Sequence, residues 1–186
     1  MTNKNQKPTK LLWVDLEMTG LDSKKDVILE IAAEITDFDF STLTTYEAGI
    51  KHPKDKVAKL LQANAWYQSY PENRDHFLKN LENGKKIADV EQEMIELLEK
   101  QFGNEPAILA GNSIYNDRMF IKEWMPNLDL KMHYRMLDVS SWKIIMHGKF
   151  DKQFKKPEVH RAFEDIQGSI AELEYYLEYF KKNAKS

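Results

Sequence analysis

The chain has 186 residues, of which 42% are hydrophobic, so it is long enough for one well-covered core and we expect a single domain. It contains no cysteine, which excludes disulfides, zinc–thiolate sites and thiol nucleophiles and fits a reducing compartment such as the cytoplasm. The net charge of −3 argues against a protein that wraps long nucleic acid through many phosphate contacts, but it leaves room for one small phosphate site.

The N-terminal residues 1–10 are polar and basic, and the apolar run that follows them is too short for a signal or an anchor. We therefore predict a flexible tail there rather than a secretory signal or an anchor. No apolar run approaches the length of a membrane span, and the mean hydropathy is −0.62. These observations predict a soluble protein with no membrane partner, folded over residues 11–183.

The first half of the chain changes from a strand pattern to a helical one. Residues 11–14 are an apolar run, residues 27–40 are rich in Ile and Val, and residues 44–51 end before Pro53, so we expect a β-meander. From residue 57 to residue 102 the apolar spacing is helical. Asp89 is the expected N-cap of a helix that ends at Gly103.

Strands and helices alternate in the second half. Residues 106–110 predict a buried strand, residues 116–124 a helix, and residues 136–139 a strand that leads into a helix through Ile145. A lysine-rich loop is expected at residues 148–157. A final helix then places apolar residues on one face, namely Ala162, Ile166, Ile170, Leu173, Leu177 and Phe180. This order predicts an α/β fold in which a mixed five-stranded sheet is flanked by helices.

Two carboxylates end the first predicted strand. Asp15 and Glu17 are two residues apart, and residues i and i+2 of a strand point to the same side, so both side chains would converge on one spot. With 31% charged residues in the chain, acid pairs also arise by chance. Taken alone, an exposed pair of acids at a strand end is the simpler interpretation.

Two further polar segments follow buried elements. Residues 111–118 lie between a predicted strand and a helix, where ligands gather in open α/β sheets, but Asn116 or Asp117 would also serve as a simple helix cap. His160 and Asp165 would lie roughly 140° apart on one continuous helix, so we expect His160 in the loop and Asp165 in an early turn. The alternative is a surface histidine and an acid favoured by the helix dipole.

Together these segments resemble the three motifs of the DEDD exonucleases of the histidine subtype, which have a ribonuclease H-like fold. The first comprises residues 13–21 (WVDLEMTGL), the second residues 111–114 (GNSI) with Asp117, and the third residues 160–162 (HRA) with Asp165. Residues 133–135 (HYR), 137–140 (LDVS) and 169–173 (SIAEL) also resemble the oligoribonucleases in particular. The resemblance covers about residues 11–179. It departs from the family pattern at four positions that bear on pocket shape: Tyr115, Asn116, Met119 and Met136.

The resemblance implies a 3′→5′ exoribonuclease that hydrolyses very short RNA, dinucleotides in particular, to nucleoside 5′-monophosphates by two-metal-ion catalysis. The ligands of two divalent cations, Mg²⁺ or Mn²⁺, would be Asp15, Glu17, Asp117 and Asp165, because these ions prefer oxygen. His160 would be the general base that takes a proton from the attacking water.

The resemblance also implies residues that hold the bases. Leu21 would be a wedge between the two terminal bases, while Trp66 and Tyr134 would stack on bases. Trp66 has an equally good interpretation as a core aromatic residue. Because Tyr134 reaches over from the partner subunit in this family, the resemblance implies a homodimer.

A third set of residues would hold the 5′-phosphate of the substrate. Ser113, Arg135 and Ser140 match the positions that grip this group, and Arg can bind a phosphate bidentately. A cap over that phosphate would restrict the enzyme to very short RNA. The lysines at 149, 152, 155 and 156 would either attract RNA or only solvate their loop.

Two other functions remain possible from the sequence. One is a related exonuclease that trims longer DNA or RNA with the same five residues, and residues 133–140 argue against it. The other is an inactive member that only binds nucleotides or a protein, and the complete set of five catalytic side chains argues against that. The sequence has no HExxH pair, P-loop or G-x-S-x-G elbow.

Overall fold

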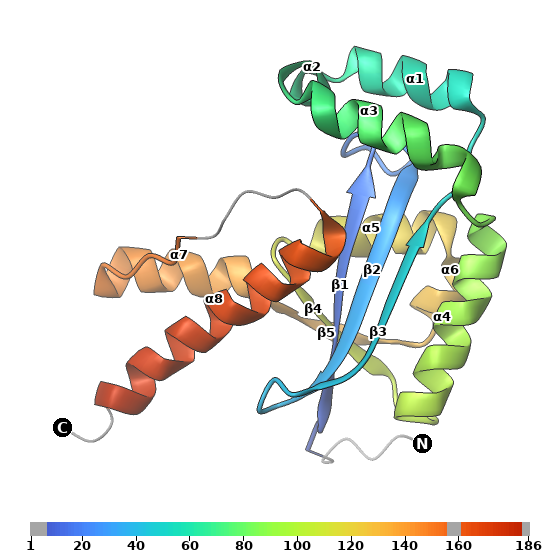
Figure 1. The fold of residues 1–186 in the computed structure, drawn as a ribbon. Helices are drawn as coiled ribbons and strands as arrows, with labels where there is room; N and C mark the ends of the chain where they lie inside the picture. Colours follow the sequence, from blue (N-terminus) through green and yellow to red (C-terminus); the bar gives the residue numbers. More distant parts are fainter. Residues whose placement is uncertain (1–6, 156–160, 184–186) are drawn as a thin grey trace.

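The computed structural model describes residues 7–155 and 161–183 (Figure 1). Its centre is a mixed sheet with the strand order β3-β2-β1-β4-β5. The strands are β1 (Lys10–Met18), β2 (Ile28–Asp37), β3 (Thr42–Gly49), β4 (Ala107–Gly111) and β5 (Met132–Asp138). The first three pair antiparallel, while β1 with β4 and β4 with β5 are parallel. The predicted five-stranded mixed sheet and its β-meander are confirmed.

The central strand β1 buries both of its faces. Leu12, Val14 and Leu16 belong to a core that includes residues of α4 (Ile87–Phe102) and α5 (Tyr115–Trp124). Leu11 and Trp13 pack instead with α8 (Ala162–Asn183) and with Val139, the first residue of α7 (Val139–Phe150). Figure 1 shows α8 crossing the front of the sheet with α5 behind it. Because strand residues alternate, Asp15 and Glu17 share the face of Trp13, which α8 covers.

Three helices lie across the end of the sheet at which β1 terminates (Figure 1). They are α1 (Lys54–Ala63), α2 (Ala65–Ser69) and α3 (Pro71–Asn80), followed by a short 3-10 helix at Leu81–Asn83. A separate apolar cluster joins them to the start of β2, and its buried members are Val27, Leu29, Val57, Leu61, Tyr67, Phe77 and Leu81. This cluster fixes α2 beside the end of β1.

The helix α4 begins earlier than the sequence predicted, because its N-cap is Lys86 and not Asp89. Lys85 forms a bridge to the end of β3 and the residues that follow it: its N–H donates to the carbonyl of Gly49, and its carbonyl accepts from the N–H of Lys51. The chain is therefore held extended up to Lys85, and the helix starts directly after this bridge. Asp89 lies in the first turn, where a negative charge still favours the helix dipole.

The last third of the chain contains more regular structure than expected. The strand β5 starts at Met132 rather than at residue 136, and α7 runs past Ile145 and Gly148 to Phe150, so the expected loop begins only at Asp151. A further turn of helix, α6 (Pro126–Asp129), precedes β5. The strand β1 begins at Lys10, the last residue of the expected tail, whose residues 1–6 lie outside the described part of the chain. No helix in the described ranges is both long and apolar enough to cross a membrane.

Candidate functional site

The structure brings together three carboxylates, which we call the carboxylate cluster. Asp15 and Glu17 come from β1, and Asp165 comes from the first turn of α8, as expected. One oxygen from each of the three lies within 4.8 Å of the others, and all three side chains are half-buried. The N–H of Asp165 donates to the carbonyl of Arg161 at 2.9 Å, so the helix itself holds this carboxylate at the sheet.

Asp117, on α5, is held against the backbone of β1 by a hydrogen bond. Its side chain is buried, and its Oδ1 accepts the N–H of Leu16, which lies between Asp15 and Glu17, at 3.0 Å. It lies outside the three-residue cluster but interacts electrostatically with both acids. Neither Asn116 nor Asp117 caps α5, because the N-cap is Ile114 and both residues lie in the first turn. The four acids predicted from sequence therefore meet around one segment of β1.

Gly111 allows β4 to approach β1 at this point. A Cβ atom on this residue would lie 3.0 Å from the carbonyl oxygen of Val14 and 2.9 Å from the Ile114 side chain. Contacts this short require a neighbour to move. The glycine therefore sets the spacing that carries Asp117 to the backbone of Leu16.

Burial and the repulsion between their negative charges raise the pKa of two of these acids. Burial, then the charges of Asp15 and Asp165, raise the pKa of Glu17 to about 8. Burial and the charge of Asp15 also raise the pKa of Asp117 well above its usual range, although the N–H of Leu16 favours its charged form. A divalent cation would balance this charge, and a donor set made only of oxygen atoms fits Mg²⁺ or Mn²⁺.

An apolar pocket of about 300 Å³ adjoins the carboxylate cluster. It is lined by Leu16, Glu17, Met18, Gly20, Leu21, Asn64, Trp66 and Tyr67. At the rim of the pocket, the chain turns between β1 and β2. The side chain of Asp26 accepts hydrogen bonds there from the Thr19 hydroxyl (2.9 Å) and the Asp22 N–H (3.0 Å). A Cβ on Gly20 would lie only 2.5 Å from this carboxylate. The tight turn leaves Leu21 78% exposed beside the pocket.

The helix α2 forms the opposite wall of this pocket. Asn64 caps the helix by accepting the Trp66 N–H, and its amide donates to the carbonyl of Thr19, both at 2.9 Å. The hydroxyl of Tyr67 donates to the carbonyl of Met18 at 2.7 Å. Trp66 stacks on Tyr70 and lines the pocket, so it is more than a core aromatic. Sequence reasoning missed Asn64, although an Asn directly before a helical segment is a usual N-cap signal.

The two predicted serines meet at the end of the sheet. Ser113, which has a positive φ of 50°, follows β4, and Ser140 lies in the first turn of α7. The N–H of Ser113 donates to Ser140 Oγ at 2.9 Å and to Asp138 Oδ1 at 3.0 Å, and the two hydroxyls are 3.1 Å apart. The parallel pairing of β4 with β5 brings these segments together, and we call these two residues the serine pair.

Tyr134 and Arg135, two further predicted residues, lie apart from the apolar pocket. Tyr134 is 72% exposed on the edge strand β5, where its ring stacks on His133 and lies under the guanidinium of Arg135. Neither Tyr134 nor Arg135 lines the apolar pocket in this chain. His160 lies outside the described residues. Its neighbour Arg161 contacts α3, with a hydrogen bond to Asn73 and its guanidinium over the Phe77 ring.

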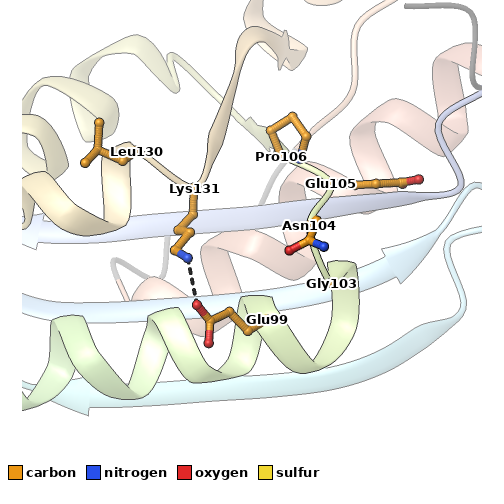
Figure 2. A pocket seen from close by; sticks show the side chains of 7 residues that line it. All are labelled: Glu99, Gly103, Asn104, Glu105, Pro106, Leu130 and Lys131. Atoms are coloured by element: carbon orange, nitrogen blue, oxygen red, sulfur yellow. Dashed lines mark hydrogen bonds and ion pairs between the residues drawn. The ribbon is translucent and has the colours of Figure 1, made fainter. Parts of the chain in front are cut away.

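A larger hollow of about 460 Å³ lies at the opposite end of β4, where that strand begins (Figure 2). It is lined by Glu99, Gly103, Asn104, Glu105, Pro106, Leu130 and Lys131. Figure 2 shows its one drawn ion pair, in which Lys131 contacts Glu99 at 2.7 Å. None of the predicted site residues that the structure describes lines this hollow, so the carboxylate cluster and the apolar pocket remain the candidate site.

Sequence comparison identifies relatives over nearly the whole chain. The family model RNase_T, described as Exonuclease, matches residues 12–173. A probable oligoribonuclease of Caenorhabditis elegans is 38% identical, and the match covers 95% of this chain and 93% of that protein. An oligoribonuclease of Francisella tularensis is also 38% identical, with 92% and 96% covered. One from Corynebacterium glutamicum is 40% identical, with 92% and 80% covered.

Solved structures share the fold. Exonuclease I from Methylocaldum szegediense has a TM-score of 0.63 at 14% identity, covering 88% of this chain and 39% of that one. E. coli exonuclease I in complex with a 5cy-dT13 oligonucleotide has a TM-score of 0.61 at 13% identity, covering 89% and 40%. This chain therefore spans about two fifths of those structures. The likeness confirms the predicted ribonuclease H-like fold.

Proposed function

Because the chain belongs to the Exonuclease family, and within it to the oligoribonucleases, we propose that it hydrolyses RNA dinucleotides to nucleoside 5′-monophosphates with two divalent cations. Family membership makes it a 3′→5′ exoribonuclease that acts on short RNA. The observation that carries the finer proposal is the apolar pocket directly beside the carboxylate cluster. Its volume of about 300 Å³ is at the lower end of small-molecule sites and suits one terminal nucleotide.

The four acids act as a unit in the proposed mechanism. Asp15, Glu17, Asp117 and Asp165 would hold Mg²⁺ or Mn²⁺, which would compensate charge at the phosphorus and at the attacking and leaving oxygens. His160, outside the described residues, accepts the proton of the attacking water. The N–H of Leu16 holds the Asp117 carboxylate against β1.

Substrate is held by an apolar wall and a polar cap. Leu21 and Trp66 line the pocket from opposite sides and hold the terminal bases by contact and stacking. The serine pair, Ser113 and Ser140, together with Arg135, binds the 5′-phosphate. A cap over the 5′-phosphate would leave no room for a further nucleotide, so a longer strand would not fit.

We also infer a homodimer that works in the cytoplasm. Tyr134 is 72% exposed, and Ile144 and Ile145 on α7 are 71% and 55% exposed. Large apolar side chains that are exposed in a single chain are typical of a protein interface. A second copy of this chain would cover them and would bring Tyr134 to the neighbouring pocket, which it does not reach in its own chain.

The test is a time course with a 5′-labelled RNA dinucleotide and a labelled strand of about 20 nucleotides, in Mn²⁺ or in EDTA. We expect rapid loss of the dinucleotide in Mn²⁺ alone, with the long strand spared. Asp15→Asn should lower the rate at least about 100-fold, because it removes a charged oxygen ligand. Trimming of the long strand with the dinucleotide spared would refute the proposal, as would equal rates in EDTA.

A further inference from the structure

Glu172 is a fully buried carboxylate for which the proposed mechanism has no use. It lies on α8 two turns after Asp165, and it is 0% exposed. Tyr176 donates its hydroxyl to Oε1 at 2.8 Å, Asn112 donates its amide to Oε2 at 3.1 Å, and Lys143 lies 3.8 Å from Oε1. A carboxylate is buried at a cost that only such donors offset.

These contacts fix the orientation of the Asn112 side chain. A carboxylate only accepts hydrogen bonds, so the NH₂ group of Asn112 must face Glu172. The same nitrogen lies 3.0 Å from the hydroxyl of Ser169, whose own proton is donated to the carbonyl of Asp165 at 2.8 Å. Two acceptors therefore hold the amide nitrogen of Asn112 against α8, and its Oδ1 faces the other way.

The fixed amide in turn orients the serine pair. Asn112 Oδ1 lies 3.2 Å from Ser140 Oγ, so the hydroxyl of Ser140 donates to it. Having one proton, Ser140 then accepts from Ser113, both from its N–H and from its hydroxyl. The hydroxyl of Ser113 can rotate toward a phosphate oxygen without breaking the other hydrogen bonds of this network. The N–H of Ser113 continues to donate to Ser140 Oγ.

We propose that Glu172, acting through Asn112 and Ser140, positions the Ser113 hydroxyl for the 5′-phosphate of the substrate and thereby sets the preference for 5′-phosphorylated short RNA. The inference rests on the proposed function. Glu172 and Asn112 are positioning residues, since neither needs to touch the substrate. Seven residues separate Asp165 from Glu172, about 10 Å along one rigid helix. The helix α8 therefore carries Asp165 of the carboxylate cluster and, through Glu172, the support of the serine pair. It thereby fixes the spacing between the two sites.

The experiment compares a dinucleotide that carries a 5′-phosphate with the same dinucleotide that ends in a 5′-hydroxyl, in Mn²⁺. In Asn112→Ala and in Glu172→Leu, the KM for the phosphorylated substrate should rise about tenfold, the size expected when one well-aligned phosphate contact is lost. The kcat and KM for the hydroxyl substrate should stay within about twofold of wild type.

Two variants separate positioning from general stability. Glu172→Gln, unlike Glu172→Leu, should keep a near wild-type KM for the phosphorylated dinucleotide. Its amide oxygen can still accept from Asn112, while its NH₂ faces the rotatable hydroxyl of Tyr176. Tyr176→Phe removes the other bond to Glu172 but leaves that of Asn112. It should lower the melting temperature without changing the ratio of the two KM values.

An unchanged ratio in a folded Asn112→Ala protein would overturn the inference, as would an equal rise of both KM values or the same loss in Tyr176→Phe. If Glu172→Leu does not fold, Asn112→Ala and Glu172→Gln decide the question. A wild type that hydrolyses neither dinucleotide would instead contradict the proposed function. The dissociation constants of the two uncleaved dinucleotides in EDTA would then still test the role of Asn112.

Discussion

The surroundings of Glu17 disfavour the charged form of its carboxyl group, although a metal ligand must be charged. Burial and two neighbouring carboxylates raise its pKa to about 8, and a bound cation would reverse that effect. A folded-state pKa above the ordinary 4.5 stabilises the protein most below pH 4.5, and this stabilisation is lost as the pH rises through about 8. Without metal, the site is therefore a source of instability at neutral and alkaline pH.

We predict that Glu17→Gln raises the melting temperature in EDTA at neutral pH by about 2–4 °C, and that this difference grows between about pH 4.5 and about pH 8 and levels off above it. The same variant should lose most of the stabilisation that Mn²⁺ gives to the wild type, because it removes one charged ligand. Thermal unfolding with and without Mn²⁺ measures both effects. Glu82→Gln, at an exposed acid far from the cluster, serves as the control and should behave as wild type.

Among single residues, the acids were predictable and their supports were not. Asp15, Glu17, Asp117 and Asp165 could be selected because their order along the chain resembles that of a known family. Residues 169–173 also resemble that family, but no role followed for Glu172, since it lies beside Leu173 in a helix whose apolar spacing already explained the fold. A buried polar residue becomes evident only when its partner Asn112, 60 residues away, is placed in space.

At the scale of elements, the close approach of β4 to β1 depends on Gly111. We predict that Gly111→Ala lowers the free energy of unfolding by about 1–3 kcal/mol, because its Cβ would lie 3.0 Å from the carbonyl oxygen of Val14. Urea denaturation followed by circular dichroism measures the change. Gly148→Ala is the matched control: its Cβ meets nothing within 4 Å, so this change in α7 should stabilise by about 0.5–1 kcal/mol. Equal effects of both substitutions would contradict the prediction.

The elements that sequence predicted well are those whose pattern follows from burial alone. The strands β1, β2 and β4 are apolar runs, and α8 keeps one apolar face over its length. The errors occur where tertiary contacts determine the boundary. The hydrogen bonds of Lys85 with the end of β3 place the start of α4 at Ile87. The first half of β5 was not predicted, because Tyr134 and Arg135 are exposed at the sheet edge and give no apolar strand pattern. Gly148 suggested a helix end, yet α7 continues through it to Phe150.

At the scale of the whole molecule, the exposed side chains of α7 predict the oligomeric state. Ile145→Lys should convert the proposed dimer into a monomer, because it places a charge in the apolar interface. Light scattering during size-exclusion chromatography measures the mass. Leu130→Lys is the control, since Leu130 is 80% exposed but lines the hollow at the other end of β4 (Figure 2). A wild type that elutes as a monomer at micromolar concentration would refute the dimer.

The carboxylate cluster takes its members from β1 and from α8, which stand at opposite ends of the fold along the chain. During biosynthesis the ribosome releases β1 first, but Asp165 emerges only after the whole sheet has been translated. Asp117, Ser113 and Ser140 also precede α8. A nascent chain therefore acquires the complete set of acids only as α8 docks, so a copy cut before α8 would lack Asp165 and, under the proposed mechanism, one of its four metal ligands.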